Sequence, residues 1–174
     1  MKRFFALTMS VISIATLSSP AYAAEKGWRY WGYYQAAPST TQWHMALTEP
    51  SVAVKDGSVE GWVFTLSSKS VQSTPPKTAP KFSTLCKGVK KESGIARVGL
   101  VVDFGNSAIA PKGEKSPNSI ATCVRVAQGS LGIDVLDQAT HVRASTQGFI
   151  CAISSFPAKE CSAEIVVPQV LLKK

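Results

Sequence analysis

Four cysteines constrain the fold of this chain more than any other feature. They lie at Cys86, Cys123, Cys151 and Cys161, and an even number of cysteines in an exported chain is typical of disulfides. Four cysteines allow three connectivities. We favour Cys86–Cys123 and Cys151–Cys161, which join sequence neighbours without crossing. On the chain-entropy model, these two loops stabilise the fold by roughly 4 and 3 kcal/mol.

The segment 1–23 indicates export. A basic start at Lys2 and Arg3 precedes a short apolar stretch and an Ala-Tyr-Ala sequence that ends at Ala23. This pattern is typical of a secretory signal peptide, and the apolar stretch is too short to span a bilayer. Nothing later is apolar for long enough to form a membrane helix. We expect 24–174 to be a single secreted domain, extracellular or associated with the cell envelope.

The charge of the exported chain is moderately basic. The chain has 19 basic and 11 acidic residues, and removal of Lys2 and Arg3 leaves 17 basic ones, a net charge of about +6. The basic residues are scattered except for Lys87, Lys90 and Lys91. Such a charge distribution favours weak attraction to anionic surfaces or a solvated loop. Nucleic acid is a poor partner for an exported protein.

The residue pattern predicts an α+β fold in three parts. Residues 24–66 hold aromatic and β-branched runs typical of an antiparallel sheet of hairpins, and the Asp-Gly pair at 56–57 predicts a turn. Residues 67–81 are polar, contain three prolines and predict an exposed loop. Residues 82–174 follow the order strand, loop, strand, helix, strand, typical of a sheet packed on one helix.

Individual elements of the third part can be placed by periodicity. A short helix is expected over 81–91, and the apolar run 98–102 predicts a strand covered on both faces. Ser130 is expected to cap the helix that follows it. The run from Gly148 predicts the last clear strand, and the segment near Pro168 predicts an edge strand.

Metal or catalytic motifs are not found in the sequence. His44 and His141 stand alone, and the closest cysteines do not have zinc-ligand spacing. If all four cysteines pair, no thiolate remains as a nucleophile. Asp103 ends the most strand-like run, but no second carboxylate lies at a defined spacing from it. We therefore expect no enzyme, no metal and no cofactor.

The aromatic residues offer the best candidate for a binding site. In the run RYWGYY, the two-residue period of a strand places Trp31 and Tyr33 on one face. They form either the core beneath a small sheet or a platform for a flat ligand. As ligand-binding candidates we select Trp31, Tyr33, Trp43 and Phe156.

Several segments resemble a family of small exported actinobacterial proteins of unknown activity. They are RYW, DGxVEGWxF, RVGLVVDFG and ICAIxxFPxxxC, together with the four cysteines. Genes of this family are often found near energy-coupling-factor transporters. The second half also resembles the small β-rich domain of transcobalamin-type proteins, and the matching residues are Val102-Asp103, Gly129-Ser130, Val135 to Ala139 and Gly148 to Ile153.

This resemblance implies a β-grasp-like sheet over one helix and a corrinoid-like ligand. We therefore expect an exported, non-catalytic binding or accessory protein that handles a corrinoid or similar micronutrient beside an envelope transporter component. The alternative is a cell-envelope protein that binds another protein or an anionic wall polymer.

Overall fold

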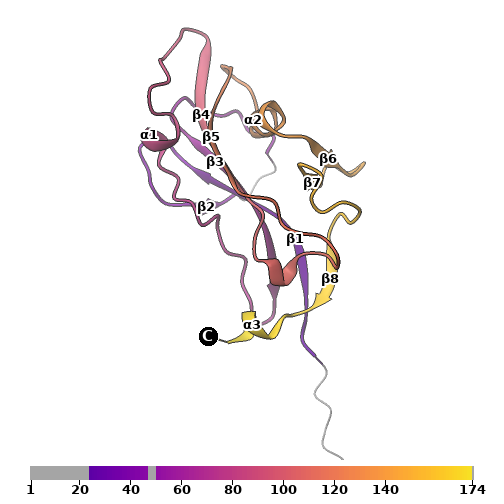
Figure 1. The fold of residues 1–174 in the computed structure, drawn as a ribbon. Coiled ribbons are helices and arrows are strands. Elements are labelled where there is room, and N and C mark those ends of the chain that lie inside the picture. The colour runs from indigo at the N-terminus through magenta and orange to yellow at the C-terminus, as the bar shows by residue number, and fades with distance from the viewer. Residues whose placement is uncertain (1–23, 47–49, 174) are drawn as a thin grey trace, which may run out of the picture.

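The computed structural model describes residues 24–46 and 50–173, so the expected signal peptide lies outside the described residues. The fold is α+β with one large mixed sheet, which confirms the predicted class (Figure 1). In chain order the elements are β1 (Lys26–Ala36), β2 (His44–Met45), β3 (Val59–Ser68), α1 (Phe82–Leu85), β4 (Ile95–Asp103), the 3-10 helix η1 (Ser107–Ile109), β5 (Ile120–Ala127), α2 (Gly132–Ala139), β6 (Val142–Ala144), β7 (Ile150–Ile153), β8 (Ala163–Val166) and α3 (Gln169–Leu172).

The aromatic first part and the second part share one sheet. Its strand order is β2-β1-β3-β4-β5, with β8 paired to β1. The strands β1 and β3 are antiparallel, as expected, but β3 runs parallel to β4, with Val59 opposite Gly99 and Val63 opposite Asp103. The expectation that the hairpin strands would be followed by a separate sheet is therefore wrong, because this parallel pair fuses the two parts.

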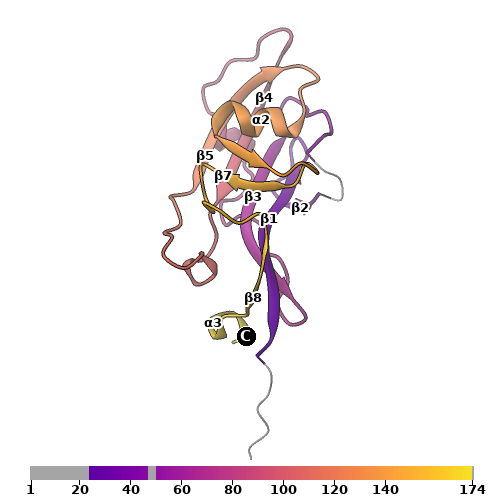
Figure 2. The ribbon, with the colours of Figure 1, turned by 90° about the vertical axis from the view of Figure 1, so that its right-hand side faces the viewer.

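Both faces of the central strands are covered. Figure 2 shows α2 and the β6–β7 hairpin in front of one face of the sheet, and α1 contacts β4 and β5 from the other. The continuous apolar run of β4 fits this double coverage, as predicted. The main core lies on the α2 face and includes Trp31, Trp62, Phe64, Leu100, Val102, Phe104, Val135, Leu136, Ile153 and Phe156.

The connection between β3 and α1 also packs against the sheet. Most of its side chains are exposed, but Pro76 and Pro80 are buried. Pro76 and the ring of Trp43 lie against Gly61 of β3, so this connection covers part of the second sheet face. The helix expected over 81–91 is limited to the four residues of α1.

The helix α2 forms where the sequence predicts it, but Ser130 does not cap it. The Ser130 carbonyl instead accepts a hydrogen bond from the Val54 amide, at 2.9 Å. The Asp134 carboxylate accepts from the Leu131 amide at 2.7 Å, and the first two helical amides donate to carbonyls of the segment 50–54. The prediction fails because backbone from a distant loop satisfies the helix terminus.

Both favoured disulfides form, Cys86–Cys123 and Cys151–Cys161. The first joins the end of α1 to β5, and the second joins β7 to the segment that enters β8. The run GFICAISSFPAKEC is thus a strand and loop closed by a disulfide, with a cis peptide bond before Pro157.

Candidate functional site

Two of the four predicted ligand-binding residues lie in the core. Trp31 is 9% exposed and Phe156 is 3% exposed. The Trp31 indole N–H donates to the Phe156 carbonyl at 3.3 Å, and its ring meets that of Phe104 edge-on at 5.5 Å. Trp31 therefore packs mainly against other core side chains.

The other two predicted residues lie on opposite faces of the sheet. Tyr33 stacks on Trp62 with ring centroids 4.8 Å apart, on the face that carries α2. Trp43 contacts Gly61 on the other face, and its indole N–H donates to the Thr78 carbonyl at 3.0 Å. The structure thus brings Trp31 and Phe156 together but gives the four residues no common ligand platform.

A different hollow includes the exposed edge of Trp31. It lies between β1 and the β6–β7 hairpin and has a volume of about 540 Å³. We call it the hairpin hollow, and its lining residues are Tyr30, Trp31, Ser145, Gln147, Phe149, Ile150, Cys161 and Ser162. Phe149 at the hairpin turn is 63% exposed, the most exposed large apolar side chain of the described residues.

Hydrogen bonds fix the turn that carries Phe149. The Ser145 amide donates to the Phe149 carbonyl at 2.9 Å, and the Ser145 hydroxyl accepts from the amides of Gln147 and Phe149. Two residues on, Cys151 anchors the strand through its disulfide. The aromatic ring of Phe149 is therefore held on an ordered turn beside the hollow.

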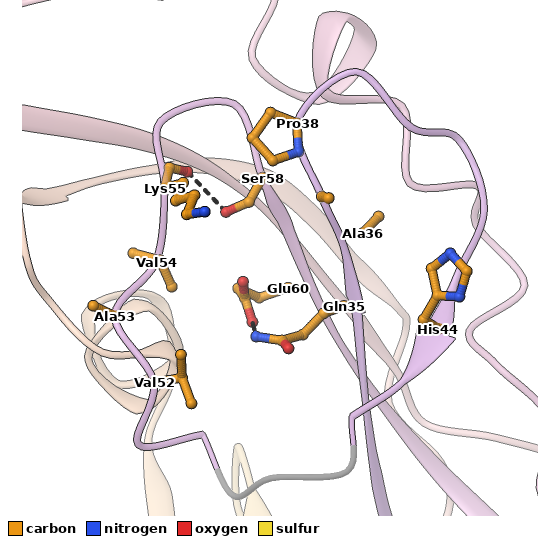
Figure 3. Close-up of a pocket in the computed structure, with 11 residues that line it drawn as sticks. Gln35, Ala36, Pro38, His44, Val52, Ala53, Val54, Lys55, Ser58 and Glu60 are labelled. Carbon is orange, nitrogen blue, oxygen red and sulfur yellow. Dashed lines mark hydrogen bonds between the residues drawn. The ribbon is translucent and has the colours of Figure 1, made fainter.

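A second cavity holds a buried carboxylate. This cavity, the Glu60 pocket, has a volume of about 340 Å³ and lies between the end of β1 and the segment 52–55. Figure 3 shows Glu60 between two walls, with Val52, Ala53 and Val54 on one side and Ala36, Pro38 and His44 on the other. Glu60 is 1% exposed.

Hydrogen bonds connect three polar side chains, of which Gln35 and Glu60 line this pocket and Tyr33 lies behind them. The Tyr33 hydroxyl donates to Oε2 of Glu60. The Gln35 amide nitrogen lies 3.1 Å from the same Oε2 and 2.7 Å from the Tyr33 oxygen. Burial raises the pKa of the Glu60 carboxyl, and the hydrogen bonds offset only part of this increase. Burial and the nearby carboxylate also raise the pKa of Tyr33.

The helix α2 approaches this polar group so closely that only glycine fits. A Cβ atom on Gly132 would lie 2.5 Å from the Tyr33 hydroxyl oxygen and 3.4 Å from Oε2 of Glu60. Real Cβ atoms do not approach other heavy atoms to 2.5 Å, so the missing side chain leaves room for the Tyr33–Glu60 hydrogen bond.

Glu60 is not among the predicted site residues, although the sequence carries a signal for it. In the run VEGWVFTL, the two-residue period places Glu60 on the same strand face as Trp62, Phe64 and Leu66. A carboxylate on the apolar face of a strand is unusual, because burial of an unpaired charge is costly. The hollow beside Phe149 has no comparable signal, since it depends on how the hairpin packs against β1.

A family model described as an SCO2322-like domain matches residues 23–166. The chain belongs to this family. No significant match to a curated protein or to a solved structure was found. Membership of the SCO2322-like family agrees with the expectation of an uncharacterised family, and it assigns no activity.

The structure also gives evidence on the cellular compartment of the protein. Its two disulfides fit a protein outside the reducing cytoplasm. Within 24–46 and 50–173, no helix is long and apolar enough to cross a membrane. Those same ranges contain no group of three or more potential metal ligands.

Proposed function

We propose that the protein is an exported, non-catalytic binding module that holds a flat, largely apolar small molecule in the hairpin hollow. A corrinoid or similar micronutrient, handled beside an uptake transporter, is the ligand class we place first. The observation that carries this proposal is the exposed ring of Phe149 on an ordered turn beside an apolar hollow.

The size and lining of the hollow support a small-molecule ligand. Its volume of about 540 Å³ lies within the range of roughly 300–1,000 Å³ that is usual for ligand pockets. Aromatic rings from Tyr30, Trp31 and Phe149 contribute to its lining, and such rings interact favourably with flat faces of other π systems. Ser145, Gln147 and Ser162 add polar groups that would orient a ligand.

The resemblance to transcobalamin-type small domains is the reason for placing corrinoids first. In those relatives the domain lies against a bound corrinoid. Here the corresponding strand is β7, at the end of the hairpin that borders the hollow. A macrocycle larger than the hollow would be covered on one face only, as expected for an accessory module that passes its ligand to a partner.

Calorimetric titration of the oxidised protein with cobalamin and cobinamide tests the proposal. We expect saturable binding, weakened about tenfold by Phe149→Ala, which removes the exposed ring. Val170→Ala is the matched control, because Val170 is also exposed but lies outside the hollow. The absence of heat with every corrinoid would exclude this ligand class, and equal binding by wild type and Phe149→Ala would exclude the hollow.

The second candidate is a cell-envelope protein that binds another protein or an anionic wall polymer. Lys87, Lys90 and Lys91 favour it, because all three side chains are exposed in the loop after α1. This loop is anchored next to Lys87 by the disulfide of Cys86. Binding to a polyglycerol phosphate that disappears with moderate salt would support this function, since exposed charges are screened within about 10 Å at 0.1 M salt.

A further inference from the structure

The Glu60 pocket carries an inference that is independent of the hairpin hollow. Glu60 belongs to the strand face that forms the core, yet its side chain ends in a cavity of about 340 Å³. Tyr33 and Gln35 both donate to Oε2 of its carboxylate. A side-chain hydrogen bond with Ser58 also acts on the carboxyl group.

Neighbouring side chains leave part of the acceptor capacity of this carboxylate unused. A hydrogen bond with Ser58 lowers the pKa of Glu60, and the Ser58 hydroxyl also lies 2.8 Å from the Lys55 carbonyl oxygen (Figure 3). Lys55 lines the pocket, yet the ion pairs of the described chain do not include Glu60. An ionised carboxylate has about four acceptor sites, and within the described residues the hydrogen bonds from Tyr33, Gln35 and Ser58 use three of them, with no cationic partner.

The walls of the pocket select among possible ligands. A carboxylate disfavours anions, and a metal ion needs several oxygen ligands, whereas the described residues gather no group of three metal ligands. Apart from the polar groups of Gln35, His44, Lys55 and Ser58, the lining is apolar: Ala36, Ala37, Pro38, Val52, Ala53 and Val54. One acceptor at the end of an apolar cavity fits a positively charged head on a short hydrocarbon chain.

We propose that the Glu60 pocket binds a protonated primary amine. The ammonium group donates to Oε1 of Glu60, and the alkyl chain lies along Val52, Val54 and Ala36. Tyr33 and Gln35 are positioning residues, because their hydrogen bonds to Oε2 fix the orientation of the carboxylate. A charge-assisted hydrogen bond of this kind is about twice as strong as a neutral one, and exclusion of water strengthens it further.

The test is an amide-NMR titration of the oxidised protein with n-butylammonium near neutral pH. We expect saturable shifts of the Gln35, Ala36 and Ser58 amides. The neutral analogue n-butanol should bind about tenfold more weakly. Equal binding of the amine and the alcohol would overturn the proposal, since it would show an apolar cavity without recognition of charge. No shift with n-butylammonium would overturn it as well.

Two variants locate the site. Glu60→Gln should weaken n-butylammonium binding about tenfold, whereas Glu164→Gln removes a distant exposed carboxylate and should change nothing. If Glu60→Gln binds like wild type, the carboxylate is not the receptor. Ala53→Trp fills the pocket from an exposed wall position and should abolish binding with Glu60 intact. Unchanged binding by Ala53→Trp would exclude the pocket, even if Glu60→Gln failed to fold.

The same titration distinguishes two sources of the amine. Nα-acetyl-lysine amide presents the same ammonium group at the end of a side chain, on a peptide-like backbone. Binding tighter than that of n-butylammonium would assign the pocket to a lysine side chain of a partner protein. Weaker binding would assign it to a free small amine.

Discussion

Glu60 stands where the alternation of its strand otherwise places large apolar side chains. Burial raises its pKa, so ionisation of this carboxyl in the folded protein opposes stability. A group with a raised folded-state pKa stabilises the fold below its unfolded pKa, and this contribution is lost as the pH rises through the folded-state pKa. Asp56 acts in the opposite direction. Its hydrogen bonds from Arg97 lower its pKa to about 2, so its contribution is lost as the pH falls through the range from 3.8 to about 2.

We expect Glu60→Gln to raise the free energy of unfolding by about 1 kcal/mol near pH 8 and to leave it nearly unchanged near pH 4. The ordinary pKa of the Glu60 carboxyl is 4.5, so the difference between variant and wild type should grow above that value. Urea unfolding at the two pH values measures it, and the Asp56 contribution cancels because both proteins contain it. An equal loss of stability at both pH values would mean that Glu60 is required only for its hydrogen bonds.

At the scale of elements, the position of α2 depends on the absence of a side chain at its first residue. Gly132 begins the helix, and its missing Cβ leaves room for the hydroxyl of Tyr33. The segment 50–54 holds this end of the helix through backbone hydrogen bonds. The helix therefore cannot shift away from β1 without loss of those bonds.

Gly132→Ala should destabilise the protein although alanine is the better helix former. Helix propensity favours alanine by up to about 1 kcal/mol, but the clash with the Tyr33 hydroxyl should cost about 1–3 kcal/mol. We expect a net loss of about 1–2 kcal/mol in urea unfolding, together with weaker n-butylammonium binding. Gln138→Ala, at an exposed position of the same helix, is the control and should be nearly neutral. Stability gained by Gly132→Ala would show that α2 can retreat from the pocket.

At the scale of the whole molecule, the parallel pairing of β3 with β4 makes one cooperative sheet. All four tryptophans, Trp28, Trp31, Trp43 and Trp62, lie between the start of β1 and the middle of β3. Their fluorescence therefore reports on the first part of the chain, while far-ultraviolet circular dichroism reports on every strand and helix.

Urea unfolding followed by the two signals should give the same midpoint and slope. This is the behaviour of a single two-state domain, and it follows because β3 pairs with strands of both parts. If tryptophan fluorescence changed at a lower urea concentration than circular dichroism, residues 24–66 would unfold as a separate unit. The pairing of β3 with β4 would then be too weak to couple the two parts.

Much of the fold could be predicted from local patterns. The strand runs, the helix at 132–139 and the pairing of neighbouring cysteines follow from spacing and residue type. The pairing of β3 with β4, which joins the two parts in one sheet, could not be predicted. The two-residue period of a strand indicates which residues share a face, but it does not indicate which strand lies beside it. Burial of Trp31 was not predictable for a similar reason, since a strand with aromatic side chains on both faces does not reveal which face the core covers. Phe156 lies in the loop after β7, where the two-residue period of a strand gives no indication of burial.

The pairing of β1 with β8 sets the order in which the molecule can be completed. Lys26 and Glu164 form an ion pair across 138 positions of the chain, in strands that lie side by side (Figure 1). The edge of β1, the first strand to be synthesised, therefore stays uncovered until β8, the last strand, has been made and pairs with it. Such distant contacts form slowly, and until they form, the aromatic strand stays open to a chaperone or to another copy of the chain.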